Sequence, residues 1–312
     1  MSEPLPLLIA TNGDLLFAAA VMLRSVCAQV ADPSRLRVVM YDDGVPSEEL
    51  ERFRGYCEGE LGIALEVYGD EDLAGPEREL MERLAAALPG APRGLYARFV
   101  LARLIPSEAA RAVYADVDLV AVGPLEELWS VPLHGHAAGA VEAPSAELLK
   151  GQPGLQRYFN AGVMAIDRER WAAERVSERC TEWLEAHPGT PLPDQVALNV
   201  VLADPDGAPL WEPLPPIWNA LPRLYVDAWG DSSYEAPRRE ELRIVHYAGP
   251  WKPWNSDEHP LTEEFMRHVP HVPFAIPERM SVRRRASLTR RWTRVPRRWV
   301  RRWRRRGAGG RR

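Results

Sequence analysis

Short apolar runs, each closed by turn residues, recur along the chain. Strands are expected at residues 5–10, 36–41, 63–68, 112–122, 137–141, 162–166 and 242–247. Between several of these runs apolar residues return at helical spacing, which predicts helices that begin near residues 15, 47, 76 and 168. Strands that alternate with helices are typical of a single α/β domain with a mixed, mainly parallel sheet and helices on both faces.

Local signals set the expected ends of these elements. Ser47 is a suitable N-cap for the second helix, and Pro76 suits the first turn of the third. Apolar spacing from 168 to 187 predicts one long helix with Trp171 and Cys180 on its buried side. Residues 204–240 contain seven prolines and are expected to form loops.

Composition is that of a globular protein. Of the 312 residues 46% are hydrophobic and 27% charged, enough for a sizeable core. The three cysteines are far apart and lack Cys-x-x-Cys spacing, so we expect neither a disulfide framework nor a zinc site, and a reducing compartment fits better. No positively charged leader precedes the first apolar residues, and the longest apolar run near them has nine residues, where a membrane span needs about 20.

Charge is distributed unevenly along the chain. Residues 281–312 hold fifteen arginines and no acid, whereas the other 280 residues hold 24 basic and 44 acidic side chains, a net of −20. Within the basic block the apolar residues recur at the spacing of an amphipathic, interfacial segment; they are Leu288, Trp292, Val295, Trp299 and Trp303. Pro296 interrupts the pattern, so two short helices or a kink are expected rather than one rod.

We therefore divide the chain into a body, residues 1–280, and an arginine/tryptophan-rich tail, residues 281–312. The tail is expected to hold a cytoplasmic protein at the anionic inner face of the cell membrane. A solvated, disordered tail and a nucleic-acid-binding tail are the alternatives. The negative body argues against a polyanion that lies across the whole protein.

Candidate chemistry begins at Asp116-Val117-Asp118, where two acids interrupt an apolar run. Buried carboxylates are unfavourable unless they are paired or bound to a metal. Residues i and i+2 of a strand share a face, so both carboxylates would point at one ion, and oxygen ligands suit Mg²⁺ or Mn²⁺. The alternative is a strand end that reaches solvent.

A second signal follows the last predicted strand. His246 would add a nitrogen ligand, although a single histidine is also common as an ordinary core or surface residue. Lys252 is one of only two lysines among 39 basic residues and would supply a point charge for a diphosphate. Gly249 would let the backbone approach that group closely.

Six motifs in a fixed order extend these features from about residue 7 to about residue 272. They are Ala10-Thr11-Asn12; Leu95-Tyr96-Ala97-Arg98; Val113-Tyr114-Ala115-Asp116-Val117-Asp118; Tyr158-Phe159-Asn160-Ala161-Gly162-Val163; Asp194-Gln195 with Leu198-Asn199; and His246-Tyr247-Ala248-Gly249-Pro250-Trp251-Lys252-Pro253-Trp254. Together they resemble glycosyltransferase family eight, the retaining transferases that include bacterial lipooligosaccharide galactosyltransferases. The resemblance implies a Rossmann-like nucleotide-sugar-binding domain of the glycosyltransferase A type over residues 1–280.

The resemblance also implies a role for each matching residue. The ligands of a Mn²⁺ or Mg²⁺ ion at the donor diphosphate would be Asp116, Asp118 and His246. The nucleotide and its diphosphate would contact Ala10, Asn12, Val117, Gly249 and Lys252. The donor sugar would contact Arg98, Glu142, Asn160, Ala161, Gly162, Asp194 and Gln195, of which Asp194 and Gln195 are the candidate catalytic residues.

The chain departs from the family pattern at several of these positions. Asn12 stands where the family usually has an acid, and Leu15 where an aromatic side chain stacks on uracil. Asp14 is the candidate to replace the lost acid as a nucleotide contact. Glu142 replaces the usual Asp, and Val196 replaces a second acid, which removes one candidate nucleophile. We expect weaker UDP binding than in typical relatives, or acceptance of another base.

The expected reaction is transfer of a hexose or hexuronic residue from a nucleoside-diphosphate sugar, with a UDP-sugar as the expected donor. The acceptor would be a saccharide or glycolipid, as in lipopolysaccharide biosynthesis, and the anomeric configuration would be retained. Gln195 is a poor nucleophile, so front-face attack is expected, with the leaving phosphate accepting the acceptor's proton.

Two other functions are alternatives. A nucleotidyltransferase acting on a sugar phosphate would need a Gly-rich, basic phosphate loop, which residues 11–16 do not supply. A non-catalytic membrane- or RNA-binding protein would have a degenerate site, and the intact acid pair, His246 and Lys252 count against it.

Overall fold

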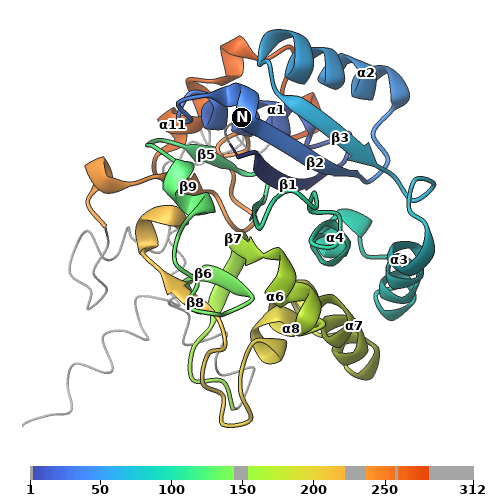
Figure 1. The fold of residues 1–312 in the computed structure, drawn as a ribbon. Coiled ribbons are helices and arrows are strands. Elements are labelled where there is room, and N and C mark those ends of the chain that lie inside the picture. The colour runs from blue at the N-terminus through green and yellow to red at the C-terminus, as the bar shows by residue number, and fades with distance from the viewer. Residues whose placement is uncertain (1–2, 144–153, 222–236, 257–258, 281–312) are drawn as a thin grey trace, which may run out of the picture.

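The computed structural model describes residues 3–143, 154–221, 237–256 and 259–280. A seven-stranded sheet runs through them in the order β3-β2-β1-β4-β7-β6-β8 (Figure 1). Its strands are β1 (Leu5–Thr11), β2 (Leu36–Asp42), β3 (Ala64–Tyr68), β4 (Arg111–Ala115), β6 (Ala138–Glu142), β7 (Phe159–Asp167) and β8 (Glu212–Leu214). Only β7 runs antiparallel to its neighbours. The predicted mixed, mainly parallel sheet is confirmed.

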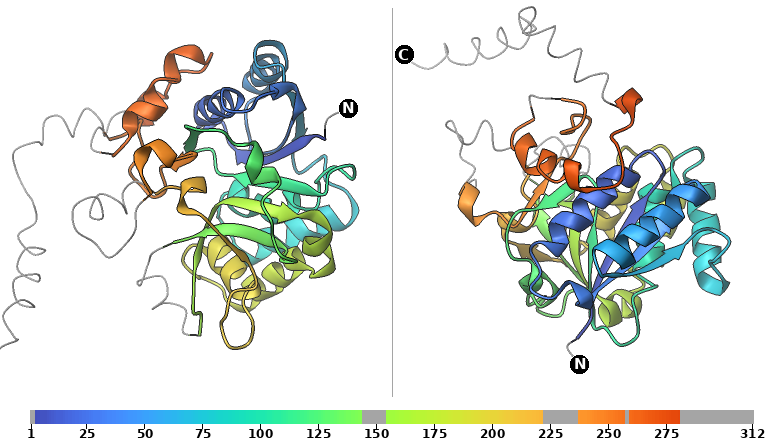
Figure 2. Two further views of the ribbon diagram at one scale, coloured as in Figure 1. Left: turned by 60° about the vertical axis from the view of Figure 1, so that its left-hand side comes forward. Right: turned by 90° about the horizontal axis from the view of Figure 1, so that it is seen from above.

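Helices cover both faces of the sheet (Figures 1 and 2). One face carries α1 (Leu16–Cys27) and α2 (Ser47–Gly55), with α11 (Thr262–Met266) beside α1. The other face carries α4 (Arg93–Leu101), α7 (Val176–Ala186) and α8 (Pro193–Val201). Two more helices, α3 (Gly75–Ala87) and α6 (Arg168–Ala173), pack against α7. The first turn of α3 contains Pro76, as predicted.

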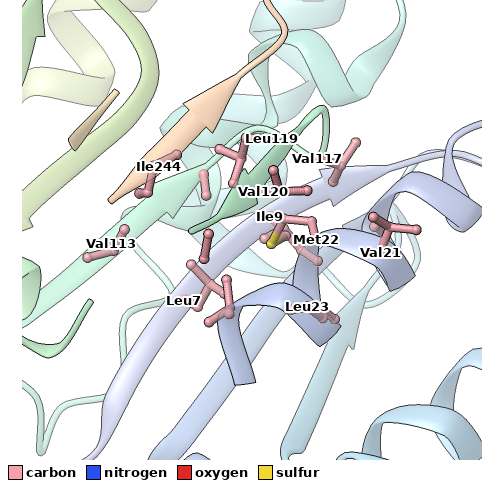
Figure 3. Packing of buried hydrophobic residues seen from close by; sticks show 14 of the residues in the cluster. Leu7, Ile9, Val21, Met22, Leu23, Val113, Val117, Leu119, Val120 and Ile244 are labelled. Carbon is pink, nitrogen blue, oxygen red and sulfur yellow. The ribbon is translucent and has the colours of Figure 1, made fainter. Parts of the chain in front are cut away.

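Side-chain alternation along the strands builds a core on each face. Leu7 and Ile9 of β1 point into the core that contains α1, whereas Leu8 between them points into the core that contains α4. Figure 3 shows the first core, where Ile9 of β1 lies next to Met22 of α1. The same alternation determines which residues at the ends of β1, β2 and β4 point to the face of the sheet that carries α4.

The predicted strand 112–122 is wrong as a single element. β4 ends at Ala115, and β5 (Leu119–Ala121) pairs instead with β9 (Ile244–His246) in a separate two-stranded sheet. The two acids therefore lie in the break between strands rather than on one strand face. A continuous central strand would bury both carboxylates, whereas the break leaves the side chains of Asp116 and Asp118 30% and 16% exposed.

The single long helix predicted over 168–187 is also wrong. It is divided into α6 and α7 at Arg175, whose φ of 52° is left-handed. The division lets the Trp171 indole donate to Ser177 Oγ at 2.8 Å, and that hydroxyl donates to the Phe99 carbonyl at 2.7 Å. Trp171 and Cys180 are buried, as predicted.

Helix α2 begins differently from the prediction. Ser47 does not cap α2: the first helical hydrogen bond runs from Leu50 N–H to the Pro46 carbonyl, so Ser47 lies inside the helix and makes no capping bond.

None of the helices in the described ranges has the length and apolar character that a bilayer crossing requires. The predicted tail, 281–312, lies outside the described residues.

Candidate functional site

Backbone pairing brings Asp116, Asp118 and His246 together. The N–H of Asp116 donates to the Gly162 carbonyl at 2.8 Å, one step beyond the pairing of β4 with β7. In the β5–β9 pair Leu119 is opposite His246, and the Tyr247 N–H donates to the Asp118 carbonyl at 2.9 Å. The two acids and the histidine therefore meet at the carboxyl end of β4.

The three side chains converge on one point. Their ligand atoms all lie within 4.8 Å of one another. His246 Nε2 is 3.2 Å from Asp118 Oδ1 and 3.8 Å from Asp116 Oδ2. His246 Nδ1 is 2.9 Å from Oδ1 of Asn219, whose amide nitrogen donates to Asn160, and this pattern assigns the proton to Nδ1. Nε2 faces two carboxylates, an arrangement that either a proton on Nε2 or a cation between the three side chains stabilises.

Arg98 of α4 connects the acids. Its Nη2 is 3.2 Å from Asp116 Oδ1 and 3.0 Å from Asp194 Oδ2. Its Nη1 donates to the Ala161 carbonyl at 2.7 Å. The guanidinium lies over the Tyr114 ring at 4.5 Å, and the Tyr114 hydroxyl donates to Asp116 Oδ1 at 2.9 Å. A planar, permanently charged guanidinium suits this double attachment.

Burial and charge oppose each other in this cluster. Burial acts to lower the pKa of Arg98, but Tyr114, Asp194 and Asp116 outweigh it and raise that pKa above its ordinary value. Burial raises the pKa of Asp194, and Arg98 offsets this only in part. The Arg98 side chain is 6% exposed, so this charge is held in place by its partners rather than by water.

Lys252 adds a second cation on the other side of the metal ligands. Its Nζ donates to Asp118 Oδ2 and, at 2.8 Å, to the Tyr247 carbonyl. Burial would raise the pKa of Asp118, but His246 and Lys252 outweigh it and hold that pKa well below its usual range. Gly249, with a φ of 91°, makes the turn that carries the chain from His246 to Lys252.

An amide network fixes the predicted sugar-binding residues. Gln195 Oε1 accepts from Asn160 Nδ2 at 3.1 Å and from the Ala161 N–H at 3.0 Å. Gln195 Nε2 donates to the Tyr158 hydroxyl at 3.1 Å. Asn160 Oδ1 in turn accepts from the Gly162 N–H at 3.0 Å. Both ends of the Gln195 amide are therefore engaged, which suits a positioning role better than attack on a sugar.

The remaining predicted residues lie at the border of this network. Ala10 is the next-to-last residue of β1, and Asn12 and Asp14 lie in the turn after it. Exposed Asp14 forms an ion pair with Arg279. The Val117 side chain belongs to the core of Figure 3, which leaves its backbone for a nucleotide contact. Glu142, at the end of β6, accepts from Arg157 Nε at 3.0 Å.

Three residues of the site were not identified from the sequence. Asn219 bridges His246 to Asn160, Tyr114 bridges Arg98 to Asp116, and Tyr158 holds Gln195. Tyr114 and Tyr158 stand within the recognised motifs, so their position was an available signal. Asn219 lies in the proline-rich segment, where its polar side chain gave no sign of being fully buried.

Comparison with known proteins identifies the family. Residues 6–258 match the model described as Glycosyl transferase family 8. The chain belongs to glycosyl transferase family 8. Membership of family 8 agrees with the glycosyltransferase prediction and counts against the nucleotidyltransferase alternative.

Family 8 relatives include general stress protein A of Bacillus subtilis, 31% identical over 193 residues, which are 58% of this chain and 66% of that protein. The lipopolysaccharide 1,3-galactosyltransferase of Salmonella typhimurium is 26% identical over 288 residues, 84% of this chain and 77% of that protein. The lipopolysaccharide 1,2-glucosyltransferase of Escherichia coli is 27% identical over 172 residues. The chain spans only 49% of the length of this last relative.

Solved structures share the fold. The galactosyltransferase LgtC, in complex with donor and acceptor sugar analogues, superposes with a TM-score of 0.69 at 21% identity, over 88% of this chain and 98% of LgtC. The bifunctional glycosyltransferase WbbM superposes with a TM-score of 0.70 at 17% identity, over 91% of this chain and 52% of WbbM. The predicted glycosyltransferase A-type fold is confirmed.

Proposed function

We propose that the protein is a metal-dependent, retaining glycosyltransferase that moves a hexose or hexuronic residue from a nucleoside-diphosphate sugar, a UDP-sugar by preference, to a saccharide or glycolipid acceptor. The observation that carries the proposal is the convergence of Asp116, Asp118 and His246 next to Lys252. Membership of family 8 supports the same reaction class.

The residues present fit a bound dication. Two carboxylates and an imidazole form a donor set suited to Mn²⁺ or Mg²⁺. Gly162 leaves the space: a Cβ there would be 2.2 Å from His246 Cε1 and 2.8 Å from Asp116 Oδ2. Asp116, Asp118 and His246 would hold the ion, which would supply positive charge to stabilise the departing diphosphate.

The chain's own cations would act on the same leaving group. Lys252 uses two of its three N–H donors on Asp118 and Tyr247, and the third would donate to a phosphate oxygen. Arg98 would hold Asp194 and Asp116 in fixed positions at the donor sugar. Because these groups are already anchored, little reorganisation would be needed as charge develops.

Retention would follow from front-face attack. A double displacement needs a free nucleophile below the anomeric carbon, and the Gln195 amide is bound at both ends. Asp194 is the remaining carboxylate, but it is paired with Arg98. The acceptor hydroxyl would attack on the face from which the diphosphate leaves, and its proton would pass to a leaving phosphate oxygen.

The two parts of the chain would have different roles. Residues 1–280 would form the catalytic unit, and the tail, 281–312, would dock on an anionic membrane, at the cytoplasmic face. The lipopolysaccharide transferases among the relatives support an acceptor of that kind, a saccharide on a lipid carrier.

The metal site gives the sharpest test. Asp118→Asn and His246→Ala should fold, because the first keeps the volume of the side chain and the second changes the last residue of β9, outside the seven-stranded sheet. Transfer from UDP-sugars should fall on the order of 100- to 1000-fold, because each change removes a ligand of a charge-stabilising ion. Donor turnover with titrated Mn²⁺ measures this, and Asp32→Asn, at an exposed turn, is the matched control. Full activity of either variant in chelator would contradict the proposal.

A further inference from the structure

Two polar side chains stand side by side at the carboxyl ends of β1 and β2. Thr11 is paired with Asp42 in the parallel ladder, and the next step continues it, because the Asp43 N–H donates to the Thr11 carbonyl at 2.9 Å. Asn12 and Asp43 are therefore the first residues after two paired strands, which lie about 4.8 Å apart.

Both positions belong to the α4 side of the sheet. Two residues earlier, Ala10 and Tyr41 pack into the α4 core, and alternation directs Asn12 and Asp43 to the same side. Gly94, at the start of α4, confirms this for Asp43: its N–H donates to Asp43 Oδ2 at 3.0 Å. A Cβ on Gly94 would be 3.4 Å from Asp43 Oδ2 and 3.8 Å from Ala10 Cβ. Asp43 thus lies beside Ala10, which the family resemblance makes a nucleotide contact.

The two side chains present a donor next to an acceptor. Asn12 Oδ1 accepts from the Leu15 N–H at 3.1 Å, so the amide nitrogen is the end available to a ligand. Asp43 uses Oδ2 on Gly94, and within the described ranges its Oδ1 accepts no hydrogen bond. An amide N–H and a carboxylate oxygen therefore stand together at the nucleotide end of the site.

The carboxylates of the neighbouring acids already have hydrogen-bond or ion-pair partners. Asp14 is paired with Arg279, so its carboxylate does not turn towards the end of β1 without breaking that ion pair. Asp42 Oδ1 accepts from the Val45 N–H at 2.6 Å. Asp70 pairs with Arg93 at 2.6 Å. Alternation from Met40, in the α1 core, directs Asp42 to the α1 side. Among these acids, Asp43 is the one that combines a position on the α4 side with a carboxylate oxygen that accepts no hydrogen bond in the described part of the chain.

We propose that Asp43, together with Asn12, reads the base of the donor nucleotide and takes over the role of the acid that the family has at Asn12. The inference rests on the proposed function. A base that fits presents an N–H beside a carbonyl: uracil, thymine or guanine. The ring N–H donates to Asp43, and the carbonyl accepts from Asn12. Cytosine and adenine present an unprotonated ring nitrogen there, which a carboxylate repels.

Asp43→Asn tests this directly. The amide oxygen keeps the bond to the Gly94 N–H, while an N–H₂ group replaces the oxygen that faces the base. UDP affinity should fall about 10- to 100-fold and CDP affinity should rise, since cytosine N3 accepts where uracil N3–H donates. Calorimetry with UDP, CDP, GDP, ADP and dTDP in Mn²⁺ measures the UDP-to-CDP ratio. A helix-capping role alone would leave that ratio unchanged. Asp43→Ser, which can still cap Gly94, should weaken UDP without improving CDP.

Two further variants separate the outcomes. Asp42→Asn is the matched control: it removes one nearby charge and should leave the UDP-to-CDP ratio as it is. Asp14→Asn tests the other candidate for reading the base, and the inference expects no change of the ratio in that variant. A wild-type preference for CDP or ADP, an unchanged ratio in Asp43→Asn, or a shifted ratio in Asp14→Asn overturns the inference while the proposed function stands. If no nucleoside diphosphate binds in the presence of metal, the proposed function fails as well.

Discussion

Gly162 makes the contact between β7 and the metal ligands possible. Its position opposite Asp116 leaves no room for a side chain, because a Cβ would be 2.2 Å from His246 Cε1 and 2.8 Å from Asp116 Oδ2. Gly162→Ala should therefore displace at least one ligand and weaken Mn²⁺ binding at least 10-fold. Titration of Mn²⁺, followed by calorimetry, measures the change, with donor hydrolysis as a second readout.

Gly55→Ala is the control for this substitution. Gly55 ends α2, and a Cβ there would meet nothing within 4 Å. Removing a helical glycine should leave stability unchanged or raise it by up to about 1 kcal/mol, with no effect on Mn²⁺. Unaltered Mn²⁺ affinity in Gly162→Ala would mean that the ion does not sit between His246 and Asp116.

Among the single residues of the site, those within local motifs could be predicted from the sequence. Asp116, Asp118 and His246 were recognisable because an acid or imidazole beside an apolar run is unusual, and the structure brings them together. Asn219 was not recognisable, since its role depends on contacts with His246 and Asn160 that only the folded chain creates. The pairing of Asp14 with Arg279 arises in the same way, between residues from opposite ends of the described chain.

Arg175 separates two helices at the cost of an unfavourable backbone conformation. Its φ of 52° and ψ of 41° are left-handed, a region that disfavours side chains with a Cβ by roughly 1 kcal/mol. Arg175→Gly should therefore raise the free energy of unfolding by about 0.5–1 kcal/mol. Its exposed ion pair with Glu182 contributes little that would be lost. Urea unfolding of the two proteins measures the difference.

Arg179→Gly provides the comparison, because it removes the same charge from the interior of α7. There glycine should destabilise by about 1 kcal/mol, plus the loss of the hydrogen bond from Arg179 to the Val201 carbonyl. Opposite signs for the two variants support a break at Arg175. Equal destabilisation would instead favour the single helix that the apolar spacing predicted.

Elements formed by continuous apolar runs were predictable, and breaks within such runs were not. β1 and β2 follow from runs buried on both faces, which central parallel strands require. The break after Ala115 depends on a different partner: β4 pairs with β7, and β5 with β9. Asp116 and Asp118 interrupt the run 112–122 at that change, but two acids on one face of a single strand would give the same pattern, so periodicity alone did not identify the break.

For the whole molecule, the last described residues lie near the end of β1. The ion pair between Arg279 and Asp14 places the last described residues next to the loop that follows β1. Arg279 therefore lies at the edge of the sheet where the strands β1 and β4 end, and the second of these ends next to the metal ligands. Docking of the tail on a membrane would hold the catalytic edge close to a lipid-linked acceptor.

Deleting residues 281–312 should separate docking from chemistry. Hydrolysis of the donor, and transfer to a soluble acceptor, should stay within about twofold of the full chain, since the predicted metal and sugar residues lie before residue 280. Transfer to an acceptor embedded in anionic vesicles should fall at least 10-fold, because several arginines each contribute on the order of 1 kcal/mol at an anionic surface. Kinetic assays with the two acceptors measure both effects.

Vesicle sedimentation identifies what the tail binds. The full chain should bind anionic vesicles and be released by salt, because the Debye length shrinks from about 8 Å at physiological ionic strength to about 3 Å at 1 M. Serine at Trp292, Trp299 and Trp303 together should weaken binding but keep its salt dependence, since only the apolar contribution is removed. A truncated protein that unfolds would show that the tail packs on the body and that the boundary near 280 is misplaced. A full chain that ignores anionic vesicles yet binds RNA with a steep salt dependence would make the tail a nucleic-acid element.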